Sequence, residues 1–87
     1  MNHSVYVLYS LKDKKLYVGQ TNNLEKRFKL HLSGEIEATK HRQPLEIIYQ
    51  ENFATRGEAM TRERFLKSLW GAREKRKILD NYLKTRS

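Results

Sequence analysis

The sequence predicts an α+β domain in which a three-stranded antiparallel β-sheet is flanked by helices, in the order ββαβαα. Three short runs are rich in β-branched and aromatic residues, two near the start of the chain and one in its middle. The longer segments between and after them repeat apolar residues at helical spacing. The 87 residues predict one domain, residues 1–87 with a core at about 3–80, and one modest hydrophobic core.

The first two strands are predicted at residues 5–9 and 16–18, separated by the polar turn at residues 12–15. This arrangement is typical of a β-hairpin. We expect Gly19 to end the second strand and to have a structural role, because glycine allows the chain to turn away close to neighbouring groups. A third strand is predicted at residues 45–50, after the single proline, Pro44.

The first helix is predicted at about residues 23–32. Residues 21–23 offer capping side chains, with Glu25 in capping-box register with Asn22, and the helix should stop near Ser33 and Gly34. Leu24, Phe28 and His31 recur on one face of it, with Arg27 beside them. An arginine and a histidine therefore lie on or next to the face that should be covered.

The second helix is predicted from the Thr55 capping box through Trp70, and a last basic helix at about 72–84. Ala59, Leu66 and Trp70 fall within a narrow arc, so Trp70 is expected to be the largest side chain of the core. Glu63 falls inside the same arc. Because an unpaired buried charge is costly, Glu63 should pair with Arg27 or a lysine, lie at a cleft, or hold a metal ion.

Lys and Arg number 18 against 10 Asp and Glu, a formal net charge of +8, with most of the excess in residues 1–30 and 56–87. This charge favours polyanions, so nucleic acid is the first partner to consider, and a solvated lysine-rich surface is the alternative. The absence of cysteine excludes a disulfide scaffold, a cysteine–zinc site and a thiol nucleophile. We expect a reducing, cytoplasmic setting, and no membrane segment or signal peptide.

Tyr6 and Tyr17 lie on the two strands of the predicted hairpin, among apolar neighbours, and each hydroxyl needs a partner. Cross-strand aromatic pairing is the ordinary explanation. The alternative is that both hydroxyls converge with Arg27 and Glu63 on one polar spot that holds a phosphate.

Five elements in order resemble the GIY-YIG nuclease domain over nearly the whole chain: Ser4-Val5-Tyr6, Leu16-Tyr17-Val18-Gly19, Arg27, His31 and Glu63. The sequence is most similar to small stand-alone bacterial proteins of the UPF0213 type. Ser4 stands where the family name has Gly, and Val18 where it has Ile. The resemblance implies a GIY-YIG fold and hydrolysis of DNA phosphodiesters with one divalent metal ion, Mg²⁺ or alternatively Mn²⁺.

The resemblance also assigns roles to residues. It implies catalytic functions for Tyr6, Tyr17, Arg27, His31 and Glu63, with Glu63 holding the metal and Tyr6 acting as general base or water-positioning group. Arg27 would stabilise phosphate oxygens, and Tyr17 and His31 would orient phosphate or water. We expect no second domain for target recognition, so any substrate preference would rest on DNA structure, such as a branch, a nick or a single strand, or on a protein partner.

DNA affinity is expected from cations that contact phosphates and not bases. The candidates are Lys12, Lys14, Lys15, Lys26, Lys29, Lys40, Arg42, Arg73, Lys75, Arg76 and Lys77. Two other functions stay open: a nucleic-acid-binding module that is non-catalytic or needs a partner, and an interaction protein with an acidic partner. The sequence does not decide the oligomeric state.

Overall fold

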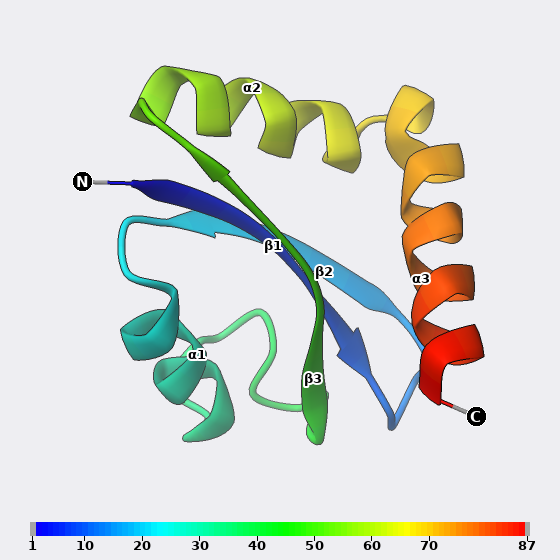
Figure 1. Cartoon of the computed structure of the whole chain (residues 1–87). Coiled ribbons are helices and arrows are strands. Elements are labelled where there is room, and N and C mark those ends of the chain that lie inside the picture. Colours follow the sequence, from blue (N-terminus) through cyan, green and yellow to red (C-terminus); the bar gives the residue numbers. More distant parts are fainter. Residues whose placement is uncertain (1, 87) are drawn as a thin grey trace.

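The computed structural model describes residues 2–86 and has the predicted α+β fold class. Its elements are β1 (His3–Ser10), β2 (Leu16–Thr21), α1 (Leu24–Leu32), β3 (Leu45–Phe53), α2 (Arg56–Lys67), the 3₁₀ helix η1 (Leu69–Gly71) and α3 (Ala72–Arg86) (Figure 1). The three strands form one antiparallel sheet in the order β2-β1-β3. The predicted order ββαβαα is therefore confirmed.

Strand β1 lies at the centre of the sheet and is buried along nearly its whole length. Because side chains alternate along a strand, β1 supplies both faces. Val5 and Val7 pack in one cluster with residues of α2 and α3, and Tyr6 and Leu8 pack in another with residues of α1. The sheet therefore separates two small cores, with α2 and α3 on one face and α1 on the other (Figure 1).

Both ends of α1 and the start of α2 agree with the predicted boundaries to within one residue. Asn23, and not Asn22, caps α1 by accepting a hydrogen bond from the backbone N–H of Lys26. Gly34 follows α1 with a φ of 79°, the left-handed conformation that glycine adopts at helix ends. Thr55 caps α2 by accepting from the backbone N–H of Glu58, as the capping box predicted.

The expectation that Gly19 ends the second strand is wrong, because β2 continues to Thr21. Gly19 pairs directly with Tyr6 across the sheet. A Cβ at position 19 would lie 2.5 Å from the Tyr6 hydroxyl oxygen and 3.1 Å from a ring carbon of Tyr17. Gly19 is therefore structural for a different reason: it leaves room for the tip of Tyr6.

The prediction that Trp70 belongs to the core is also wrong: the side chain is 84% exposed. Ala59 and Leu66 are fully buried, as predicted, but α2 ends at Lys67. The chain passes through the extended Ser68 into η1, so the helical periodicity that placed Trp70 with Leu66 does not reach it. The core on this face is completed by Ile78 of α3.

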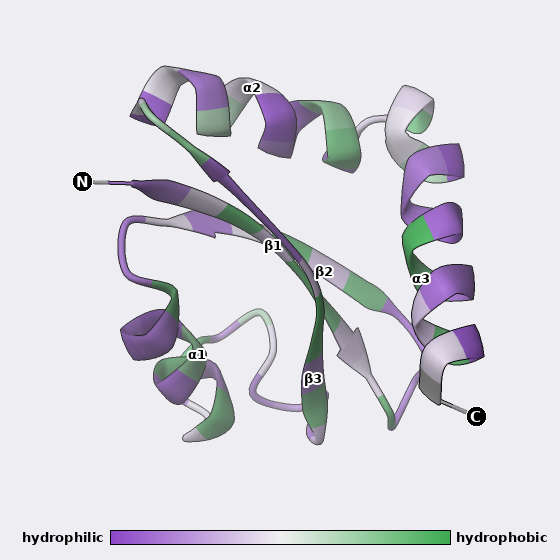
Figure 2. Ribbon diagram, in the orientation of Figure 1, coloured by the Kyte–Doolittle hydropathy of each residue, from purple (hydrophilic) through white to green (hydrophobic). Residues whose placement is uncertain are grey.

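Helices α2 and α3 carry hydrophilic and hydrophobic residues on different sides (Figure 2). Among the described residues, no helix has both the length and the apolar composition that crossing a bilayer requires.

Candidate active site

The register of the hairpin brings the two tyrosines together. Tyr6 of β1 is opposite Gly19 of β2, and Tyr17 lies two residues before Gly19, so it is the diagonal neighbour of Tyr6 on the same face. Their ring centroids are 6.4 Å apart. Tyr6, on the central strand, is fully buried, and Tyr17, on the edge strand β2, is partly buried.

His31, in the last turn of α1, closes the group. Its Nε2 lies 2.9 Å from the Tyr6 hydroxyl, and its ring meets both tyrosine rings edge-on, with centroids 5.7 Å from Tyr6 and 5.2 Å from Tyr17. His31 is fully buried. The histidine that interrupts the apolar face of α1 is therefore held within a polar cluster under that face.

Thr39 is a member of this cluster that the sequence did not indicate. Its hydroxyl lies 2.7 Å from Nδ1 of His31 and is fully buried. Gln43, from the same loop before β3, donates a side-chain hydrogen bond to the backbone carbonyl of His31. Residues 35–44 lack a secondary-structure period, so no pattern in the sequence places Thr39 against His31.

Burial sets the protonation state of the cluster. It lowers the pKa of His31 from 6.5 to about 4, with a further contribution from the positive charge of Arg27. His31 is therefore neutral at pH 7. Burial also raises the pKa of the Tyr6 hydroxyl above its usual value of 10, although the hydrogen bond with Arg27 opposes this shift. Tyr6 is accordingly held in its protonated form.

Arg27, one turn before His31 on α1, is partly buried beside the tyrosines. Its guanidinium interacts with the Tyr6 hydroxyl, which is the main reason that its pKa is raised, and more weakly with Tyr17. Its Nε is buried and has no hydrogen-bond partner among residues 2–86. An arginine beside two hydroxyls is well suited to bind an oxyanion, but the unused Nε donor is itself buried.

Glu63 lies on α2 between the buried Ala59 and Leu66, with its side chain 18% exposed. Its carboxylate pairs with Nζ of Lys67, one turn further along, at 3.1 Å. Of the three situations open to Glu63, pairing with a lysine is the one that the structure shows. Among residues 2–86 this carboxylate has no hydrogen bond or ion pair with the tyrosine cluster, and its charge is the last of the causes that raise the pKa of Tyr6, after burial and the charge of Tyr17.

A divalent metal ion fits these residues only when a phosphate substrate and water complete its coordination. Within the described part of the chain, no group of three or more His, Asp or Glu side chains could hold a metal. Mg²⁺ nevertheless binds through one or two carboxylates when waters and substrate phosphate oxygens complete its coordination. Glu63 is a hard oxygen donor whose pairing with the half-exposed Lys67 is a weak surface interaction. The donor set therefore fits Mg²⁺ together with a phosphate substrate.

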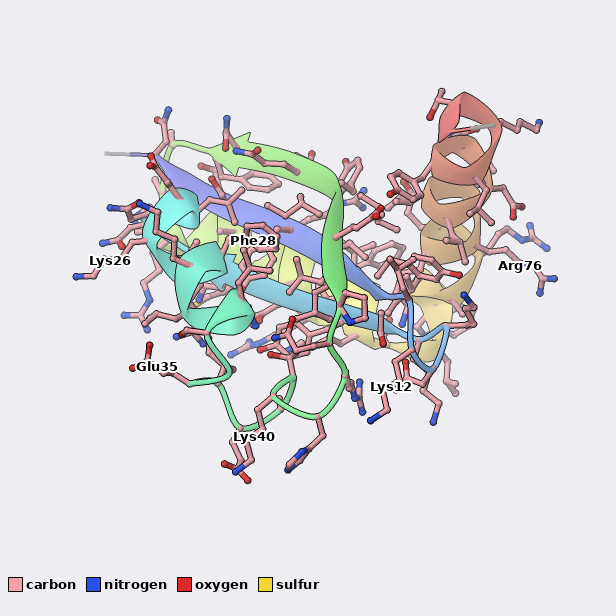
Figure 3. All side chains as sticks on the ribbon, turned by 90° about the horizontal axis from the view of Figure 1, so that it is seen from below. Lys12, Lys26, Phe28, Glu35, Lys40 and Arg76 are labelled. Carbon is pink, nitrogen blue, oxygen red and sulfur yellow. The ribbon has the colours of Figure 1, made fainter. Side chains whose placement is uncertain are left out.

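The predicted DNA-contacting cations are spread over the molecule. Figure 3 shows Lys26 on α1 and Arg76 on α3 pointing outward on different sides, with Lys12 at the hairpin turn and Lys40 in the loop before β3. Several have acidic partners: Lys29 pairs with Glu25 at 3.7 Å, Lys40 with Glu37 at 3.0 Å and Arg42 with Asp13 at 3.7 Å. Lys26 lines a groove together with Arg27 and Asn22. Lys14, Lys15, Arg73, Arg76 and Lys77 are exposed, and Lys75 is partly buried.

Known proteins are similar to this chain in sequence. Residues 2–77 match the family model of the GIY-YIG catalytic domain. The chain is 41% identical over 80 residues to a UPF0213 protein of Natronomonas pharaonis, covering 91% of this chain and 93% of the relative. It is 45% identical over 69 residues to the UPF0213 protein YazA of Bacillus subtilis, covering 78% and 69%.

A solved structure is similar as well. The solution NMR structure of a UPF0213 protein from Bacillus halodurans has a TM-score of 0.57 and 34% sequence identity to this chain. The match covers 92% of this chain and 84% of that protein.

Proposed function

The chain belongs to the GIY-YIG catalytic domain family, a family of nucleases, and from this membership we propose that it is a metal-dependent endonuclease that hydrolyses DNA phosphodiester bonds. The resemblance seen in the sequence is thereby confirmed for the family. The DNA substrate and the metal ion go beyond what family membership establishes, so they belong to the proposal. A cytoplasmic location stays a prediction.

The observation that carries the proposal is the convergence of the motif residues. Tyr6, Tyr17, Arg27 and His31 come from β1, β2 and α1 and form one contact cluster, and the charge of Glu63 of α2 contributes to raising the pKa of Tyr6. Burying a neutral histidine, a tyrosine hydroxyl and part of an arginine costs stability that apolar side chains would not. Such a concentration of perturbed polar groups is typical of a functional site.

Exposure determines which groups can meet a phosphate first. Arg27 and Tyr17 are partly exposed, so the guanidinium and the Tyr17 hydroxyl can bind the non-bridging oxygens directly. Arg27 would also stabilise the negative charge that develops as the bond to the leaving oxygen breaks. Tyr6 and His31 are fully buried.

This arrangement favours one of the two roles open to Tyr6. Because burial raises its pKa, its hydroxyl is better suited to orient a water by hydrogen bonding than to accept the proton of that water at neutral pH. Glu63 would hold the metal ion. A bound Mg²⁺ or Mn²⁺ supplies charge neutralisation at the phosphate and lowers the pKa of a bound water.

The test is cleavage of labelled DNAs with Mg²⁺ or Mn²⁺, using duplex, nicked, flap, forked, four-way-junction and single-stranded substrates. The test variant is Glu63→Gln, which removes the charge and keeps the shape. Glu25→Gln is its matched control, because Glu25 also pairs with a lysine one turn further along a helix but lies on α1. We expect metal-dependent cutting by the wild type and Glu25→Gln, and loss of at least 100-fold in Glu63→Gln.

Equal cutting by Glu63→Gln would overturn the assignment of the metal site. An absence of cutting on every substrate, with DNA binding retained, would replace the endonuclease with a binding module that is non-catalytic or requires a partner protein.

A further inference from the structure

The corner between α2 and α3 carries three of the five large apolar side chains that are exposed in residues 2–86. Trp70 is 84% and Leu69 93% exposed, and Phe65, in the last turn of α2, is 40% exposed. Single exposed apolar residues are common on proteins, but adjacent large ones mark a surface that binds something. Leu69 and Trp70 are called the corner patch below, because the Phe65 ring already has the Arg62 guanidinium 5.6 Å from its centroid.

The corner patch is held in place by the backbone around it. Ser68 ends α2, with its hydroxyl donating to the Phe65 carbonyl at 2.6 Å. Gly71 packs so tightly against the Phe65 carbonyl and Leu66 that a Cβ there would collide with the backbone. Leu69 and Trp70 lie between these two fixed points, so they are presented outward by a tight turn at the top right of Figure 1.

Cations flank the corner patch along the chain. Arg64 and Lys67 lie in the last turn of α2 and Arg73 in the first turn of α3, all exposed. Within the described residues, Arg64 and Arg73 have no ion-pair partner. With a net charge of +8, a second copy of the chain would be repelled from this surface, whereas a polyanion would be attracted.

We propose that the corner patch is a stacking platform for an unpaired base of a nucleic acid strand, with Trp70 under the base and Arg64 and Arg73 at the flanking phosphates. An exposed aromatic ring among cations is the combination with which proteins bind single strands. Bases inside a duplex are covered by their neighbours, so only a single-stranded or branched substrate presents a free face to Trp70.

The platform is close to the candidate metal ligand. From Glu63 to Lys67 the axis of α2 advances about 6 Å, and the chain then turns at the corner to reach Trp70. A strand advances about 3.4 Å per nucleotide when stacked. The stacked base would therefore lie within a few nucleotides of the phosphate at Glu63. This inference rests on the proposed function for its choice of nucleic acid, and it names the substrate class as partly single-stranded.

The experiment uses the single tryptophan as its own reporter, in EDTA so that no cleavage occurs. Trp70 emission and oligonucleotide affinity are measured with a 12-nucleotide strand, an abasic strand of equal length, and a blunt duplex. We expect quenching by the base-bearing strand alone. Trp70→Ala should weaken its binding roughly 5- to 100-fold and leave the abasic strand unaffected, while Trp70→Phe keeps most of the affinity.

Leu32→Ala, which removes another exposed apolar side chain on α1, is the matched control and should bind all three DNAs like the wild type. Equal weakening of the base-bearing and abasic strands by Trp70→Ala would overturn the platform, as would no weakening. A shift of Trp70 emission with protein concentration alone would identify a second copy as the occupant and also overturn it.

The failures of the two proposals are distinguishable. Cleavage without a Trp70 response refutes the platform and leaves the nuclease intact. Quenching by single strands with no cleavage on any substrate supports the platform and refutes the nuclease. If no nucleic acid binds at low salt, both are refuted.

Discussion

Gly19 determines where the Tyr6 hydroxyl can lie, because a methyl group at position 19 would occupy the place of the ring tip. In Gly19→Ala, the Tyr6 hydroxyl must move away from Nε2 of His31, its hydrogen-bond partner at 2.9 Å. We expect cleavage to fall at least 10-fold, with a loss of about 1–3 kcal/mol in unfolding free energy from overpacking. Cleavage assays and urea unfolding measure the two effects, and unchanged values in both would show that the site tolerates a displaced Tyr6.

The buried hydrogen bond between Thr39 and His31 should contribute to the stability of the folded protein. Thr39→Val keeps the shape of the side chain but leaves Nδ1 of His31 without a partner in a buried site. We expect a loss of about 1–3 kcal/mol in unfolding free energy, with Thr39→Ser retaining most of the stability. A Thr39→Ser variant as unstable as Thr39→Val would show that the methyl group, and not the hydroxyl, is what matters.

His31 should make the stability depend on pH. Its pKa is about 4 in the folded protein against 6.5 when unfolded, mainly because of burial. The unfolded chain therefore binds more protons between these values, so stability is fully present above pH 6.5 and falls as the pH decreases toward 4. The expected loss is about 3 kcal/mol at pH 4.

Urea unfolding at pH 7, 6, 5 and 4 measures this loss, with His31→Gln as the comparison. The variant lacks the titrating group, so its stability should fall less over the same range. Parallel curves for the two proteins would show that His31 titrates in the folded state near its usual pKa.

At the scale of elements, replacing Gly71 at the corner and Gly57 in α2 with alanine should change the stability of the protein in opposite directions. Gly71→Ala would place a methyl group against the backbone of Phe65 and Leu66, which cannot move without unwinding the end of α2. We expect it to destabilise the protein by roughly 1–3 kcal/mol. At Gly57, in the first turn of α2, a Cβ would meet nothing within 4 Å. Gly57→Ala should stabilise the protein by up to about 1 kcal/mol.

Thermal or urea unfolding of the two variants measures these effects side by side. A neutral Gly71→Ala would mean that the corner can rearrange. It would also mean that no fixed turn holds Trp70 outward.

The corner shows what sequence patterns could not predict. Strand and helix positions follow from β-branched runs, caps and periodicity, and these local signals hold for Val5, Thr55 and Leu66. Periodicity places Trp70 in the core only while the helix continues. Its end at Lys67 depends on the Ser68 cap and on the packing of Gly71 against the preceding turn, which are contacts formed in three dimensions.

The residues of the candidate site could be predicted from the sequence, but some of their contacts could not. Tyr6, Tyr17, Arg27, His31 and Glu63 could be chosen from the sequence because each is polar on an otherwise apolar face, or because of a family resemblance. That Glu63 pairs with Lys67, and that Thr39 supports His31, depends on the positions of side chains and of a loop without periodicity. Local patterns carry no information on such contacts.

For the whole molecule, the net charge of +8 attracts DNA, but its distribution decides which cations touch the bound strand. Lys26 lines a groove with Arg27, whereas Lys12 lies at the tip of the hairpin (Figure 3). If DNA is bound at the tyrosine cluster, Lys26 contacts a phosphate and Lys12 lies beyond the contact. We expect Lys26→Gln to reduce the slope of log affinity against log salt by about 0.7–0.9, the value for one lost phosphate contact, and Lys12→Gln to leave the slope unchanged.

Binding titrations of Glu63→Gln with either lysine variant, between 50 and 300 mM salt, measure this slope without interference from cleavage. Glu63→Gln alone is the reference, because both comparisons then differ from it by one cation. Equal reductions for Lys26 and Lys12 would mean that DNA is attracted by the whole basic surface and has no preferred position at the cluster. A reduction for Lys26 alone would orient the strand along α1, past Arg27, in the position that hydrolysis at this site requires.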